Sequence, residues 1–264
     1  GATFATLDEA RAETVVEAVV ARAGVADPTE LVALPVDALV AAQAAAMTDL
    51  LGKIGMMPFH PVVDGEVVTA RPSEALADGA FAGRPLVVTT TADEMRLFLP
   101  PAEPPARDRL ERRIARYAEV GDDAAHRAVD LYAADLGTDD TAAIWATVFS
   151  DVEMQLPARS VLDAHAPHGP TYSGLFTWAG PGVGACHGID IPFTFGNFGD
   201  GWAAFVGAEG ERGAEAERLS TTLRTAWAAV ARTGDPGWPA APAAMVFDAP
   251  CAVVPDHPAM TRAS

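Results

Sequence analysis

The stretch RPLVVTTTADE, residues 84–94, decides the fold. Its apolar and β-branched residues run on without alternating, a pattern typical of a short strand buried on both faces, as in a parallel sheet. Two carboxylates, Asp93 and Glu94, follow at once. Because open α/β sheets hold ligands and catalytic groups beyond the carboxyl ends of their strands, the pair Asp93-Glu94 is a candidate for a functional carboxylate. A polar loop that merely follows a strand would look the same, so this stretch alone leaves both interpretations open.

The elements around this stretch define the fold class. Two kinds of pattern occur: strand-like segments at 169–178, 244–248 and 251–255, and helical segments at 107–166 and 214–234. The helical stretch 107–166 has breaks at Gly121, Gly137 and Pro157. These patterns predict an α/β fold, rich in helix, with too few strands for a complete sheet. No internal repeat or low-complexity linker divides the chain, so we expect one domain over residues 1–264.

The N-terminal part is predicted to begin with a helix. Thr6-Leu-Asp-Glu9 has the form of a capping box, and Gly24 suits the helix end. Further along, PVVDGEVVTARP at 61–72 places β-branched residues on both sides of Asp64-Gly65, which predicts a small hairpin or an extended segment.

Composition excludes some classes of partner. The chain has 18 basic and 36 acidic residues, a formal charge of 18 − 36 = −18, and a pI near 4.5. Such a charge argues against binding to nucleic acid and against docking on anionic membranes. The sequence has no apolar run long enough to span a bilayer, and its first residues do not have the pattern of a signal peptide. The compartment stays open, with a cytoplasmic location favoured. The two cysteines, Cys186 and Cys251, make no disulfide framework, and the sequence does not show whether they pair.

One of the six histidines stands apart by its context. His187 lies in GACHGIDIPFTFGN, residues 184–197, after a strand candidate and a glycine-rich loop. A histidine on such a loop can reach a nucleophile with one ring nitrogen and a carboxylate with the other. It could equally be a structural histidine among Phe193, Phe195 and Phe198.

The other histidines carry weaker signals. His165 and His168 form an H-x-x-H pair, but Pro167 and Gly169 spoil its presentation on a helix and no further ligand clusters beside it. We therefore expect a solvated loop there rather than a metal site, and no metal or cofactor elsewhere.

A nucleophile is missing from this sequence. Acid at Glu94 followed by histidine at His187 agrees with the last two members of the order serine, acid, histidine. No G-x-S-x-G motif occurs, however, and Ser173 lies inside a strand candidate. Cys186 adjoins His187 too closely to form a catalytic pair with it, so we expect it to pack in the core.

Four segments together resemble one family, the type B carboxylesterases, which are the cholinesterase-like branch of the α/β-hydrolases, in a bacterial form. GACHGIDIPFTFGN resembles the family's histidine motif, with Asp190 where glutamate is commoner; LVVTTTADEMRLF (86–98) resembles the acid motif, with Met95 in place of a frequent glycine. PFHPVVDGEVV (58–68) is similar to the P-V-x-D-G segment, and AWAAVARTGDPGWPA (226–240) to the C-terminal helix and its Thr-Gly-Asp-Pro turn. The four occur in the family's order.

This resemblance implies the C-terminal part of an α/β-hydrolase fold and hydrolysis of small-molecule esters through an acyl-enzyme, without a cofactor. His187 would be the general base and Glu94 its acid, while Asp93 would shape the loop. The serine would lie in a segment before Gly1, so residues 1–264 alone would be inactive. Trp145 and Phe149 are expected to line a pocket or, equally well, to pack in a core.

Two other interpretations stay open at this point. One is a non-catalytic cholinesterase-like binding or adhesion module that has lost its serine. The other is a small subunit whose serine comes from a separate chain. The coding sequence before Gly1 distinguishes the three.

Overall fold

A computed structural model describes residues 6–55, 57–98, 105–118 and 120–258. The chain forms two compact units, residues 1–78 and 79–264. The expectation of one domain therefore stays a prediction.

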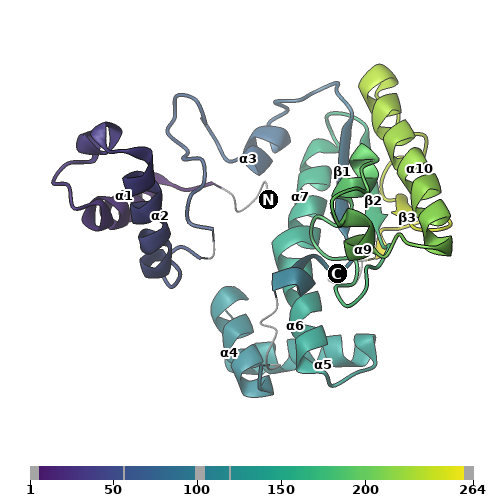
Figure 1. Cartoon of the computed structure of the whole chain (residues 1–264), viewed down its shortest axis with the longest axis horizontal. Helices are drawn as coiled ribbons and strands as arrows, with labels where there is room; N and C mark the ends of the chain where they lie inside the picture. The colour runs from purple at the N-terminus through teal and green to yellow at the C-terminus, as the bar shows by residue number, and fades with distance from the viewer. Residues whose placement is uncertain (1–5, 56, 99–104, 119, 259–264) are drawn as a thin grey trace. The chain divides into compact units, whose positions relative to one another are not determined.

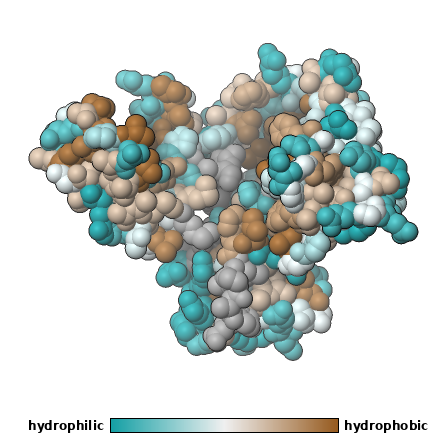
Figure 2. All heavy atoms as spheres, viewed as in Figure 1, coloured by the Kyte–Doolittle hydropathy of each residue, from teal (hydrophilic) through white to brown (hydrophobic). Residues whose placement is uncertain are grey.

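The first unit is helical in its described part. Its elements are α1 (Glu9–Ala23), the 3₁₀ turn η1 (Pro28–Ala33), α2 (Val36–Leu50) and α3 (Pro72–Ala77). Leu7, Val15, Ala46 and Leu50 form its core. Figure 2 shows apolar side chains on the surface of this unit, where Val32, Val36 and Val40 are exposed.

Two predictions for this unit are wrong in detail. The cap of α1 is Asp8, whose side chain accepts from the N–H of Arg11, because Thr6 is buried beside Leu7, which forms a parallel bridge with Val62. Of the two alternatives for the segment 61–72, the hairpin is wrong, since no strand lies there within the described residues. The Asp64 side chain instead accepts from the N–H groups of residues 66, 67 and 68, so the side chain takes the donors that a strand ladder would need.

The second unit holds the sheet. In its described part four strands occur in the order β1 (Leu86–Thr91), β2 (Thr171–Phe176), β3 (Ala244–Phe247) and β4 (Ala252–Val254). The first three are parallel and β4 pairs antiparallel with β3. In the register of β1 and β2, Thr91 lies beside Phe176, so the chain leaves both strands at the same level. The α/β fold and the small sheet are as the sequence predicts.

Helices cover the sheet on two faces (Figure 1). α7 (Leu156–His165) packs on one face, where Ala158 and Leu162 contact Val88. α10 (Glu211–Thr233) packs on the other, where Leu219 and Leu223 join Phe247 in the main core. β1 is less buried than expected for an interior strand, because its outer edge has no neighbouring strand among the described residues.

Residues 107–165 form a helical cluster. Its elements are α4 (Arg107–Ala118), α5 (Asp122–Leu136), α6 (Thr141–Ser150), the π-helical turn η3 (Asp151–Gln155) and α7. Gly121 and Gly137 interrupt the helices as predicted. At Pro157 the chain stays helical: the π-helical turn η3 runs directly into α7, and Pro157 is the second residue of α7.

Two short helices follow β2 and lead to α10. They are α8 (Ile191–Phe195) and α9 (Trp202–Val206). None of the described helices is long and apolar enough to cross a membrane.

Candidate functional site

The acid loop, residues 92–98, leaves the carboxyl end of β1 and includes the 3₁₀ turn η2 (Glu94–Phe98). Glu94 opens this turn and its side chain is only 7% exposed. Its Oε1 accepts from the backbone N–H of Thr91, at 2.8 Å, so the carboxylate folds back onto the end of its own strand. The strand end and the turn together fix this side chain.

The histidine loop, residues 177–190, leaves the carboxyl end of β2. Gly180 and Gly184 bond to each other through both backbone groups and close a tight turn ahead of His187. Gly184 has φ +64°, and a Cβ there would collide with the carboxylate of Asp93. Only glycine fits both conditions, and this is the physical reason for the glycine three residues before the histidine.

Backbone contacts set the two loops in register. The N–H of Asp93 donates to the carbonyl of Ala185, and Oδ2 of Asp93 accepts from the N–H of Ala185. The N–H of His187 donates to the carbonyl of Glu94, at 3.3 Å. Asp93 thus shapes the loops, as expected, and brings the next residue, Glu94, opposite His187.

His187 and Glu94 are paired. Nδ1 of His187 lies 2.6 Å from Oε2 of Glu94. Because a carboxylate only accepts, Nδ1 carries the proton and Nε2 is left with a lone pair when the ring is neutral. This hydrogen bond raises the pKa of His187 above its ordinary value, against the opposing effect of partial burial.

The far side of the imidazole is open. The His187 side chain is 50% exposed, and Nε2 makes no hydrogen bond within the part of the chain that the structure describes. The ring of Phe98 lies 5.8 Å from the imidazole, centroid to centroid, at a tilted angle. A neutral imidazole held at one nitrogen and open at the other can accept a proton from a group placed before it.

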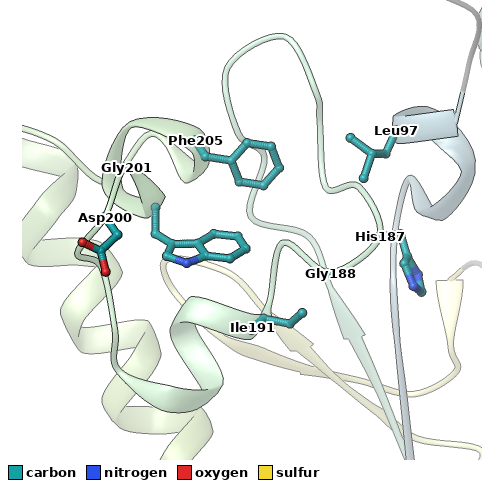
Figure 3. A pocket seen from close by; sticks show the side chains of 8 residues that line it. Leu97, His187, Gly188, Ile191, Asp200, Gly201 and Phe205 are labelled. Atoms are coloured by element: carbon teal, nitrogen blue, oxygen red, sulfur yellow. The ribbon is translucent and has the colours of Figure 1, made fainter. Parts of the chain in front are cut away.

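A pocket of about 460 Å³ adjoins the imidazole. In Figure 3, His187 and Leu97 stand on one side of it, and Phe205 and Asp200 on the other. Apolar side chains dominate its walls: Leu97, Ile191, Trp202 and Phe205. Such a pocket suits an apolar group next to the histidine.

The aromatic residues near His187 are divided between core and surface. Phe193 is fully buried among Phe176 and Trp178, whereas Phe195 is 74% exposed. Asp190 is partly buried, and this burial raises the pKa of its carboxyl above the ordinary value. The cluster therefore supports the histidine loop but does not enclose the imidazole.

The remaining candidates lie elsewhere. His165 is the last residue of α7 and is completely buried, with Nε2 2.7 Å from the carbonyl of Arg84, so the solvated loop expected there is wrong for this residue. The described residues contain no group of three side chains suited to a metal ion. Trp145 and Phe149 pack in the core of the helical cluster.

Both cysteines are free thiols. Cys186 is completely buried in the main core, as expected, and burial raises the pKa of its thiol.

Two residues that the sequence did not point to hold the end of β1 and the acid loop that follows it. Gln155 bonds to Thr90 and to the carbonyl of Thr91, and the Ser150 hydroxyl accepts from the N–H of Met95. Both come from the helical cluster, about 60 residues further along the chain. Neither the residue types nor the sequence positions of Ser150 and Gln155 predict these contacts.

Comparison with known proteins decides the family. The family profile described as "Carboxylesterase family" matches residues 16–245. The chain belongs to the carboxylesterase family. Para-nitrobenzyl esterase of Bacillus subtilis (strain 168) is 30% identical over 191 residues, which are 69% of this chain. Fumonisin B1 esterase of Sphingopyxis macrogoltabida is 33% identical over 186 residues, which are 68% of this chain.

Solved carboxylesterases share the fold. A carboxylesterase of Geobacillus stearothermophilus, at pH 6.2, is 28% identical, with a TM-score of 0.79 over 99% of this chain. The chain covers 55% of that structure, and 37% and 33% of the two curated carboxylesterases named above. It therefore spans about a third of the length of the curated relatives it matches.

Proposed function

We propose that Glu94 and His187 are the acid and the general base of a Ser-His-Glu triad that hydrolyses carboxylic esters, and that the serine lies outside residues 1–264. One observation carries the proposal: Nδ1 of His187 is 2.6 Å from the buried carboxylate of Glu94, while the other half of the ring is exposed beside an apolar pocket. Membership of the carboxylesterase family supports the class of reaction.

Each step follows from this arrangement. Nε2 of His187 takes the proton of the serine hydroxyl as the oxygen attacks the ester carbonyl. Glu94 fixes the tautomer through Nδ1–H and stabilises the imidazolium without being protonated itself. The imidazolium gives the proton to the alcohol as it leaves, and the acyl-enzyme remains. Water then attacks the acyl carbonyl while His187 takes its proton; the bond to the serine oxygen breaks, the imidazolium returns the proton to that oxygen, and the carboxylic acid leaves. These steps need no metal or organic cofactor.

The substrate class follows from the pocket. Its apolar walls suit an apolar group of the ester, and the chain's charge of −18 disfavours strongly anionic substrates. A small, neutral ester is therefore the proposed substrate.

The position of the serine rests on the sequence. No G-x-S-x-G motif occurs in residues 1–264, and Ser173 is buried within β2. The outer edge of β1 has no partner among the described strands, so the sheet can be extended there by further strands. Residues 1–264 alone should then lack both the nucleophile and the oxyanion donors.

The isolated chain tests the position of the serine. Purified 1–264 should not be labelled by a fluorophosphonate probe and should not hydrolyse p-nitrophenyl acetate above background. Robust turnover that disappears in His187→Gln would contradict this placement.

The whole translation product, with any in-frame sequence before Gly1, tests the triad. His187→Gln should lower kcat by about 10⁶ and Glu94→Gln by about 10⁴, and the double variant should be no worse than His187→Gln, because triad members act as a unit. His126→Gln, at an exposed histidine of the same unit, is the matched control. Full activity in His187→Gln would refute the triad. A whole protein with no reactive serine would instead indicate a non-catalytic module.

A further inference from the structure

The helix that runs from α6 to α7 is interrupted beside the acid loop. In η3 the backbone N–H of Leu156 donates to the carbonyl of Asp151, five residues earlier. In an α-helix of 3.6 residues per turn, residues five apart face different directions. A π-helical turn bonds each residue to the fifth one along, which brings such residues to the same side. Ser150 and Gln155 are five apart, and both bond to the acid loop or to the strand end before it.

Gln155 holds the strand end before Glu94. Its side chain is completely buried; Oε1 accepts from the hydroxyl of Thr90 at 2.6 Å, and Nε2 donates to the carbonyl of Thr91 at 2.8 Å. Between these two contacts lies the N–H of Thr91, which donates to Oε1 of Glu94. The amide of Gln155 thus holds the groups on both sides of the Thr91 N–H, which is the donor that orients the Glu94 carboxylate.

Ser150 holds the peptide after Glu94. Its Oγ accepts from the N–H of Met95 at 2.9 Å, and Ser150 is buried. The carbonyl of the same peptide unit accepts from the N–H of His187. The peptide that follows the acid is therefore held from the helix on one side and from the histidine loop on the other.

We propose that Ser150 and Gln155 are positioning residues, and that the π-helical turn between them keeps the Glu94 carboxylate hydrogen-bonded to Nδ1 of His187. Neither side chain contacts His187 in the hydrogen bonds described above, so both act through Glu94. The catalytic meaning of this role rests on the proposed function, but the contact can be measured without catalysis.

The competing explanation is that these two residues only stabilise the fold. Loss of a buried hydrogen bond lowers stability wherever it occurs, so stability alone cannot separate the two roles. Ser220 provides the matched control: it is also completely buried, and its hydroxyl donates to the carbonyl of Phe193 at 2.7 Å, away from the acid loop. Gln43, exposed on α2, is the control for loss of a glutamine.

The experiment is an NMR titration of the chain with ¹³C-labelled histidine. Glu94→Gln should lower the pKa of His187 most, because it removes the charged partner. Gln155→Leu and Ser150→Ala should lower this pKa part of the way, and Ser150→Thr, which keeps the hydroxyl, should restore it. Ser220→Ala should lower Tm yet leave this pKa unchanged, and Gln43→Leu should change neither.

The outcomes separate this proposal from the proposed function. If Glu94→Gln lowers the pKa of His187 while Gln155→Leu and Ser150→Ala do not, the positioning role is refuted and the triad stands. If Glu94→Gln has no effect, the pairing itself fails and both proposals fall. An inactive whole protein would refute the esterase alone, since the titration is independent of turnover. If circular dichroism shows that Gln155→Leu does not fold, Ser150→Ala against Ser150→Thr decides the question.

Discussion

The acid loop and the histidine loop meet at one site but are built in opposite ways. In the acid loop the functional side chain is 7% exposed, and protein groups bond to both of its oxygens. In the histidine loop the functional side chain is 50% exposed and only one of its ring nitrogens is bonded among the described residues. Hydrogen bonds therefore hold the acid side chain at both oxygens, whereas they hold the histidine side chain at one ring nitrogen.

This difference fits the two roles. A general base must present a free nitrogen to its partner, so half of the imidazole has to face the pocket. The carboxylate of Glu94 stays ionised and exchanges no proton in the proposed mechanism, so it needs no access to solvent, and burial removes competing water. We infer that the acid loop determines the geometry of the pair and that the histidine loop leaves room for the reacting group.

The largest expected difference is in stability. Glu94→Ala removes a buried side chain and leaves the N–H of Thr91 without its acceptor, so it should lower the free energy of unfolding by about 3 kcal/mol. His187→Ala should cost about 1 kcal/mol, because water can replace a half-exposed imidazole and hydrate the carboxylate. Urea denaturation of both variants measures the difference. Equal losses would mean that the two loops are equally fixed.

The histidine loop has its own fixed point at Gly184. Gly184→Ala combines a left-handed backbone, at φ +64°, with a collision against the Asp93 carboxylate, and should cost about 2 kcal/mol or more.

Gly182→Ala is the matched control, since Gly182 has φ +74° and open space around its Cβ position. It should cost about 1 kcal/mol, from the backbone alone. The difference between the two alanine variants measures how firmly Asp93 holds the histidine loop. If both variants lose the same stability, the contact with Asp93 does not constrain this loop.

Much of the site could be predicted from the sequence, because it depends on strand ends. β1 and β2 are parallel neighbours, so the loops that follow them start side by side, and Glu94 and His187 are brought together by that topology. The glycine-rich turn before the histidine was also visible as a motif.

The support of the site could not be predicted in this way. Gln155 bonds to the end of β1 and Ser150 to the acid loop, both across about 60 residues of sequence. Their placement depends on a π-helical turn, which the hydrophobic pattern of the sequence does not predict. The failed hairpin at 61–72 has a similar cause. There the carboxylate of Asp64 accepts from three backbone N–H groups, which are then not available for a strand ladder. The pattern of β-branched residues does not predict this competition.

The pair should also make stability depend on pH. The hydrogen bond to Glu94 raises the pKa of His187 above 6.5 in the folded state. The stability that the pair adds is therefore fully present below the pKa of His187 in the unfolded chain. It is lost as the pH rises through the higher pKa of His187 in the folded chain. Because the ring is half exposed, solvent screening keeps the effect below about 1 kcal/mol. The stability difference between the parent and Glu94→Gln should shrink across this window. A difference that stays constant would show that the proton on His187 is not coupled to folding.

The smallest effect concerns Asp190, three residues after the histidine. Burial raises the pKa of this carboxyl, so its ionised form is disfavoured in the folded state. The resulting penalty is absent below the unfolded pKa of 3.8 and complete above the folded pKa. Asp190→Asn should then stabilise the chain by about 0.5 kcal/mol at pH 7 and by nothing at pH 3, whereas Asp139→Asn, at an exposed position, should change neither value.

The same substitution acts in the opposite sense on the histidine. The Asp190 charge helps to raise the pKa of His187, so Asp190→Asn should lower that pKa while it stabilises the fold. A gain in stability with no change at the imidazole would assign Asp190 to the packing of the histidine loop alone. If both changes occur, the Asp190 charge costs the fold some stability and raises the pKa of His187. The charges that raise this pKa would then come from both loops, from Glu94 in the acid loop and from Asp190 in the histidine loop.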